Sequence, residues 1–318
     1  MHIPDGFLDT KTLAASAVFA SAGVSIALAR SRSTLPPSRV PLLGMTAAFL
    51  FAAQMVNFPV LGGTSGHLVG SVLAAVLLGP SGAVVALTSV LLVQAFLFAD
   101  GGILALGANV LNMAVAAPLC GYGLYRILTS VVGGRTGQIF AAGVSSWVSI
   151  VFAALLCSGE LAWSGTVPWH IIFPAMAGVH MIIGIGEALI TMLILAAILR
   201  TRPGLLENGN EGKSSKASIV AYGILLTCVI ALFLAPFASP WPDGLESVAS
   251  KLGFASRAFT ESAASSPLAG YHLPGITSPY LAAGLTGLLG AAVVAALSYF
   301  FARFIVSHAT TTNRRPRS

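Results

Sequence analysis

Long apolar stretches make up most of the chain, and polar residues gather in the short segments between them. Stretches near 20 residues are long enough to cross the roughly 30 Å hydrocarbon layer of a membrane as helices. They lack the strict alternation of a membrane β-barrel strand, so we predict helical spans. The stretch 67–78 is shorter, and we interpret it as a short helix surrounded by protein. The predicted spans are 12–30, 41–58, 67–78, 81–99, 106–129, 138–158, 171–199, 218–237 and 281–306.

The composition agrees with this pattern. Of 318 residues, 56% are hydrophobic and 8% are charged, whereas soluble proteins carry roughly 25% charged residues. The mean hydropathy is +0.89. These values exclude a soluble globular protein and predict an all-α polytopic protein of the cell membrane. The net charge is +6, but the basic residues lie at the ends of apolar stretches without interleaved aromatic residues, which argues against nucleic-acid binding.

The basic residues also predict an orientation. With nine crossings and the N-terminus outside, all of the 16 Lys and Arg residues except Lys11, Lys251 and Arg257 fall on the cytoplasmic side. Positive residues favour that side, so we expect the N-terminus outside and the C-terminus inside. Without the short crossing at 67–78, the Arg-rich C-terminus would lie outside.

A polar, Gly-rich segment at 201–217 predicts a cytoplasmic linker between two units. A seven-helix unit, 1–200, precedes it, and a two-helix unit, 218–310, follows with an external loop at 238–279 and a basic tail at 311–318. The linker contains Gly-Lys-Ser, but Glu207 occupies the position where a phosphate-binding loop needs glycine. No other catalytic motif is present, so we expect no enzyme and place any ATP hydrolysis on other chains.

The first residues, MHIPDGFLD, predict a metal chelate. An initiator Met before a bulky residue is seldom removed, so the Met1 amine stays free beside His2. This amine, the His2 amide nitrogen and the His2 Nδ1 atom can close a five-membered and a six-membered ring around one ion. His67, in LGGTSGHLVG, is the candidate fourth nitrogen. Four nitrogens in a plane suit Ni(II) or Cu(II) better than Zn(II) or Mg(II). Alternatively, His2 has no role and His67 only caps a helix.

Four polar residues near the expected site have two interpretations. They could orient the ligands or line the cavity, or they could make contacts between helices. For Asp100 we favour a simple interface position. The four residues are Asn57, Asp100, Asn109 and Asn112.

His180 and Glu187 are seven residues apart on one predicted helix, hence on one face. A proton relay between them is one interpretation. We favour the other, in which they make structural hydrogen bonds between helices.

Together with ADGGILALGANVLNMA, the two histidine segments resemble the CbiM/NikM family, the substrate-capture (S) components of energy-coupling-factor (ECF) transporters of the ABC type. The resemblance covers about residues 1–200. It implies that Met1, His2 and His67 ligate Ni²⁺ or Co²⁺ as the transported substrate, with no prosthetic group. It also implies a transmembrane coupling (T) protein and two cytosolic ATPase subunits as partners.

The second unit resembles the PDGLE or CbiN-type domain through FLAPFASPWPDGLESVASKLGF and PLAGYHLPGI. Gly270 departs from the family pattern, which has Asp before the Tyr. The resemblance implies a fused, NikMN-like arrangement in which the loop, with Asp243 and Glu246, helps to load the metal. The transported ion can be nickel or cobalt. A cobalt importer would supply cobalamin synthesis. There are two competing interpretations. One is a self-sufficient proton-coupled carrier that uses His180 and Glu187, and the other is a membrane scaffold or metal sensor.

Overall fold

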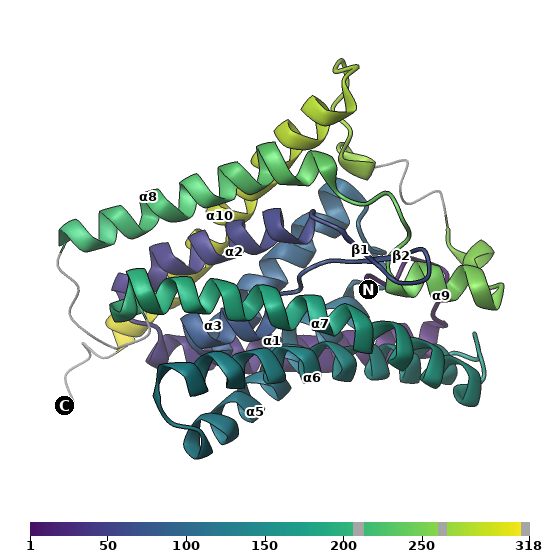
Figure 1. The fold of residues 1–318 in the computed structure, drawn as a ribbon, viewed down its shortest axis with the longest axis horizontal. Coiled ribbons are helices and arrows are strands. Elements are labelled where there is room, and N and C mark those ends of the chain that lie inside the picture. The colour runs from purple at the N-terminus through teal and green to yellow at the C-terminus, as the bar shows by residue number, and fades with distance from the viewer. Residues whose placement is uncertain (206–212, 260–265, 313–318) are drawn as a thin grey trace.

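The computed structural model describes residues 1–205, 213–259 and 266–312. The middle of the predicted linker and the end of the basic tail lie outside these ranges. The described chain is a bundle of helices with one small hairpin (Figure 1). Its main helices are α1 (Thr10–Thr34), α2 (Val40–Gln54), α3 (Ser71–Val93), α5 (Ala117–Val131), α6 (Gly134–Trp163), α7 (Trp169–Thr201), α8 (Lys213–Val229) and α10 (Pro279–Thr312).

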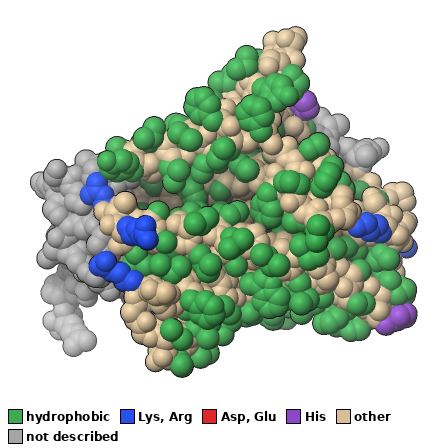
Figure 2. Space-filling view, viewed as in Figure 1, with side chains coloured by type: hydrophobic (Ala, Val, Ile, Leu, Met, Phe, Trp, Pro, Cys, Tyr) green, Lys and Arg blue, Asp and Glu red, His purple; other side chains and the backbone are tan. Residues whose placement is uncertain are grey.

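Six of the described helical segments are long and apolar enough to cross a membrane. Figure 2 shows hydrophobic side chains covering the middle of one face, with Lys and Arg near its two ends. Large apolar side chains such as Phe19, Leu193 and Phe300 are exposed on these helices, as expected where lipid covers the surface. The chain is therefore a polytopic helical membrane protein.

The predicted break near residue 79 lies inside α3. Gly79 has φ 76° and ψ 163°, and Pro80 follows it, so the helical hydrogen bonds are interrupted there. Gln54 Nε2 donates to Val69 O, just before α3, and Gln54 Oε1 accepts from Gln94 Nε2, just after it. A straight helix of this length would hold its ends more than about 30 Å apart. The two arms of α3 therefore fold back on each other, and the first arm is the short helix expected at 67–78.

Two elements were not expected from the sequence. The predicted span 41–58 ends early, because α2 stops at Gln54 and a short antiparallel hairpin follows, with β1 (Phe58–Val60) paired to β2 (Thr64–Gly66). A short helix, α9 (Gly244–Leu252), interrupts the predicted external loop. Figure 1 shows the N-terminus, the hairpin and α9 together near one end of the bundle.

The predicted span 106–129 is also more complex than one regular helix. It begins as α4 (Leu106–Asn109), widens into a π-helical segment (Val110–Ala116) and continues as α5. π-helical segments are frequent at functional sites. Here the segment follows directly after Asn109, a residue that holds the N-terminus.

Candidate metal centre

The N-terminal segment is buried inside the bundle. Met1, His2 and Ile3 are 5%, 9% and 0% exposed. Asp9 caps α1 through a hydrogen bond from Thr12 N to its Oδ1 atom (3.0 Å). Residues 1–8 therefore run inward from the start of α1 and bring the Met1 α-amine beside His67 and Asp243.

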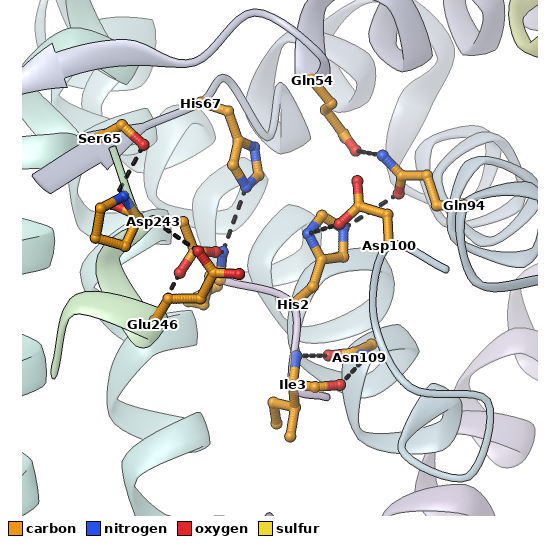
Figure 3. Close-up of polar contacts among 12 residues, drawn as sticks. His2, Ile3, Gln54, Ser65, His67, Gln94, Asp100, Asn109, Asp243 and Glu246 are labelled. Atoms are coloured by element: carbon orange, nitrogen blue, oxygen red, sulfur yellow. Dashed lines mark hydrogen bonds and ion pairs between the residues drawn. The ribbon is translucent and has the colours of Figure 1, made fainter. Parts of the chain in front are cut away.

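Side-chain and backbone hydrogen bonds hold this segment in place. Asn109 Oδ1 accepts from Ile3 N (2.7 Å), and Asn109 Nδ2 donates to Ile3 O (3.0 Å). Gly102 N donates to the same Ile3 carbonyl (2.9 Å). The Asp5 carboxylate accepts from Ile103 N (3.1 Å) and Ala105 N (3.0 Å). Asn109 thus fixes the backbone beside His2, which is how a cavity residue can orient a chelating segment (Figure 3).

His67 lies directly beside the amine. Met1 N is 3.3 Å from His67 Nε2, while His67 Nδ1 is 3.3 Å from Leu68 O. Because a carbonyl only accepts, Nδ1 carries the proton and Nε2 presents its lone pair to the amine. Burial, the N-terminal ammonium and His2 lower the pKa of His67 from 6.5 to about 3. The ring is therefore neutral, as a metal ligand has to be.

The His2 ring stacks on the His67 ring, with centroids 5.3 Å apart and planes 19° apart. Its Nε2 atom lies 3.2 Å from Gln94 Oε1, and its Nδ1 atom lies 3.2 Å from Asp100 Oδ1. Both ring nitrogens thus face oxygen acceptors. Chelation through Nδ1 requires this atom to leave Asp100 and give up any proton it carries.

Asp100 contacts the predicted ligand His2. From the sequence we favoured a simple interface position for Asp100, and this contact gives it a place at the candidate site. Tyr271 donates from its hydroxyl to Asp100 Oδ2 (2.7 Å). Burial alone raises the pKa of Asp100, but His2 and the Tyr271 hydrogen bond outweigh it, so this pKa lies below its ordinary value. Asp100 therefore carries a negative charge beside His2.

The loop that carries α9 places one carboxylate on the amine. Asp243 Oδ2 forms an ion pair with the Met1 ammonium. Its Oδ1 atom accepts from Glu246 N (2.8 Å), and Glu246 Oε2 accepts from Asp243 N (3.0 Å), so the two residues form a capping box at the start of α9. Burial raises the pKa of Asp243, but the N-terminal ammonium outweighs this and holds the pKa well below its ordinary value. Burial and the charge of Asp243 raise the pKa of Glu246.

These contacts assemble a compact set of donors. Among the described residues, ligand atoms of His2, His67 and Asp243 lie within 4.8 Å of one another. The Met1 amine touches two of these three groups. Amine and imidazole nitrogens with a carboxylate suit divalent first-row transition metals.

Asn112 and Asn57 make contacts with other parts of the chain. Asn112 Nδ2 donates to Glu160 Oε2 (2.7 Å), and Ser16 Oγ donates to the other oxygen of this carboxylate, Oε1 (2.9 Å). Asn57 contributes its backbone carbonyl to Ser239 N (2.8 Å) and so ties the hairpin to the second unit. The Asn112 side chain thus makes a contact between helices, which is one of the two interpretations of this residue, and the role of the Asn57 side chain stays a prediction.

Gln94 and Tyr271 were missed by sequence reasoning. Gln94 is a single amide in a long apolar stretch, fully buried, and it links His2 to Gln54. Its polarity at membrane depth was the available signal. Tyr271 lies more than 170 residues from its partner Asp100, and its local sequence does not reveal that contact.

Glu187 has the structural role that we favoured. Its carboxylate accepts from Val69 N (2.7 Å) and Gly70 N (2.8 Å) and so fixes the chain between His67 and α3. His180 instead bonds to its own helix, with Nδ1 2.9 Å from Met176 O. The structure therefore gives no direct hydrogen bond between the two side chains in the described part of the chain.

Comparison with known proteins identifies the family. The model of the CbiM family, described as a cobalt uptake substrate-specific transmembrane region, matches residues 2–205. The chain belongs to this CbiM family. The PDGLE domain model matches residues 217–307, so the CbiM region is fused to a PDGLE region. The chain is accordingly a cobalt or nickel transport component.

Relatives and a solved structure agree with the CbiM assignment. The "Fused nickel transport protein NikMN" of Rhodobacter capsulatus is 36% identical over 222 residues, 65% of this chain and 64% of that protein. The "Probable fused nickel transport protein LarMN" of Lactiplantibacillus plantarum is 30% identical and covers 99% of this chain and 100% of its own. The crystal structure of a truncated transition metal transporter matches with a TM-score of 0.58 and 35% identity, covering 63% of this chain and 99% of its own.

Proposed function

We propose that this chain is the substrate-capture component of an ECF-type importer for Ni²⁺ or Co²⁺. Its ligands are the Met1 amine, the His2 amide nitrogen, His2 Nδ1 and His67 Nε2. The observation that carries the proposal is the buried amine 3.3 Å from His67 Nε2, with the His2 ring stacked beside it. A planar four-nitrogen set favours nickel, and the fused nickel transport relatives support the same choice.

In this proposal the site faces the outside, with both units spanning the membrane nine times in all and the C-terminus inside. Energy comes from a transmembrane coupling protein and two cytosolic ATPase subunits. The absence of a phosphate-binding motif from the sequence supports this division of work.

The PDGLE loop controls access to the chelate. The Met1 amine is bound as an ammonium group by Asp243, and an ammonium group has no lone pair for a metal. Loading therefore requires Asp243 to leave the amine, and binding releases protons from the amine and the amide. Glu246 moves with Asp243 because the capping box joins them.

A titration with Ni²⁺ tests this proposal. We expect the purified full chain with its own Met1 to bind one ion and to develop the yellow absorbance of a planar four-nitrogen complex. Residues added before Met1 remove the free amine and should abolish both signals. The same residues added after Ser318 are the control and should change neither. Equal binding by both extended proteins would refute the N-terminal chelate.

The proton-coupled carrier is a separate alternative and needs a transport assay. Vesicles containing this chain alone are compared with vesicles that also contain the coupling protein and ATPases. We expect ATP-dependent uptake only in the second case. Uptake by the chain alone that follows an imposed proton gradient would favour the carrier.

A further inference from the structure

His180 presents an unused basic nitrogen inside the protein. The residue is 2% exposed on α7. Its Nδ1 atom lies 2.9 Å from Met176 O, so Nδ1 carries the proton and the neutral ring has a free lone pair on Nε2. This Nε2 atom has no hydrogen-bond partner in the described part of the chain. Buried polar atoms are normally paired, so this one requires an explanation.

The His180 ring borders the same small cavity as the proposed metal ligands. Met1, His67 and Asp243 line it, and it has room for about one water-sized sphere. Gly244, the first residue of α9, closes the cavity over His180. A Cβ atom at Gly244 would lie 2.8 Å from His180 Nε2. The start of α9 therefore packs directly on the unused nitrogen, next to the carboxylate that binds the amine.

His180 and His67 have the same arrangement. Each directs Nδ1 to a backbone carbonyl, Met176 O or Leu68 O, and each carries an unprotonated Nε2, which in His67 faces the Met1 amine. Metal-ligating histidines typically donate their other ring nitrogen in this way, which fixes the tautomer. The two imidazoles and Asp243 thus give a nitrogen, nitrogen and oxygen set around one cavity, which suits a divalent transition-metal ion.

His180 is not needed once the ion is bound. The proposed chelate already supplies four nitrogens, and His180 lies outside the group formed by His2, His67 and Asp243. It lies instead at the side of the cavity that Gly244 covers, next to Asp243.

We propose that His180 Nε2 is a transient ligand that, together with Asp243, receives the divalent ion as α9 opens and passes it to Met1, His2 and His67. The inference rests on the proposed function, because that chelate is the destination of the ion. A ligand used only in passage lowers the barrier in both directions. Its removal slows association and dissociation equally and leaves the dissociation constant unchanged.

Rapid mixing of the full-length protein with NiCl₂ tests this inference, with the absorbance of the four-nitrogen complex as the signal. We expect His180→Leu to slow association by about tenfold or more and to slow dissociation by the same factor. His180→Gln offers a weaker oxygen ligand and should give an intermediate rate. Ile183→Val alters the same cavity wall without removing a donor and should match the wild-type protein.

The contrary results are distinct. Wild-type association rates in His180→Leu would overturn the inference. A weaker equilibrium affinity with an unchanged dissociation rate would also overturn the inference. Loss of stoichiometric binding in both His180 variants would overturn it as well, because either result gives His180 a structural role. If the wild-type protein itself forms no complex that depends on a free Met1 amine, the proposed function fails, whatever the His180 variants do.

Discussion

The N-terminal segment and the α9 loop meet at one site, but the protein holds them in different ways. The N-terminal segment is fixed along its backbone, with Ile3 and Asp5 bonded to Asn109 and to the chain at 102–105. All of these contacts lie within the region that matches the CbiM family. The second unit adds one backbone hydrogen bond to this segment, from Phe259 N to Asp5 O (2.8 Å), so most but not all of the hold on the proposed ligands lies inside one unit.

The α9 loop, the external loop at 238–279 that carries α9, is attached to the hairpin and also to the N-terminal segment, where the Phe254 ring contacts the Phe7 ring. Ser65, in β2, donates from its backbone N–H to Pro242 O (2.8 Å) and from its hydroxyl to Trp241 O (2.7 Å). Thr64 shares a hydrogen bond with Ser247 (2.7 Å). The loop reaches the site through Asp243 and Tyr271, which act on Met1 and Asp100. We infer that the N-terminal segment determines the affinity for the metal ion. The α9 loop determines the access of the ion to the site and makes small adjustments to the affinity.

The largest effect should follow from removing a ligand. His67→Ala deletes one nitrogen of the proposed chelate, and we expect nickel affinity to fall by about a thousandfold or more, or about 4 kcal/mol. Isothermal titration of the purified protein measures this change. His272→Ala removes an exposed histidine of the loop and is the control. A His67→Ala protein that still binds tightly would break the assignment of affinity to the fixed segment.

The second-largest effect should distinguish the neighbouring side chains of Asn109 and Asn112. Asn109→Ala removes both hydrogen bonds to Ile3, and such supporting contacts are worth about 10- to 100-fold in metal affinity. Asn112→Ala is the matched control, because Asn112 is equally buried but bonds to Glu160. Titration of both variants gives the comparison. Equal losses would show that general packing, and not the hold on Ile3, supports the site.

The sequence predicted the proposed ligands because their chemistry is mostly local. The Met1 amine, the His2 amide and the His2 ring are joined by covalent bonds, so their chelate rings follow from chain order alone. The break in α3 was also readable, since Gly79 and Pro80 interrupt an apolar stretch.

The contacts from the loop could not be predicted in the same way. The ion pair between Met1 and Asp243 joins residues 242 positions apart and depends on how the second unit packs. Asp243 and Glu246 do carry the pattern of a capping box, so the start of α9 was readable from the sequence, although its partner was not. For Asn112 the sequence left a cavity position and a contact between helices both open, because polarity at membrane depth does not reveal which neighbour satisfies it.

A pH effect on stability should follow from His67. Because burial, the N-terminal ammonium and His2 hold its pKa at about 3, the unfolded chain binds a proton below pH 6.5 that the folded protein does not. Stability therefore falls as the pH drops from about 6.5 toward 3, by up to about 1.4 kcal/mol per pH unit. Thermal unfolding with a chelator present, at pH 7 and pH 5, measures the loss. It should be smaller in His67→Gln, whereas His272→Gln should behave as wild type. Equal pH sensitivity in His67→Gln would mean that other groups cause the loss.

The smallest effect should come from the loop. Tyr271→Phe removes the hydrogen bond to Asp100 Oδ2 and keeps the ring, which stacks on Phe98 with centroids 4.8 Å apart. A hydrogen bond to a charged group contributes about 1.5–3 kcal/mol to its own contact. Because Tyr271 acts on the metal site only through Asp100 and His2, we expect nickel affinity to change by only about fivefold, less than in Asn109→Ala.

Tyr280→Phe is the matched control, because Tyr280 is 59% exposed in the same unit. Titration of both variants beside Asn109→Ala measures the order of the effects. If Tyr271→Phe weakened binding as much as Asn109→Ala, the loop would position His2 as firmly as the fixed segment positions the backbone. The division between a segment that sets affinity and a loop that adjusts it would then be wrong.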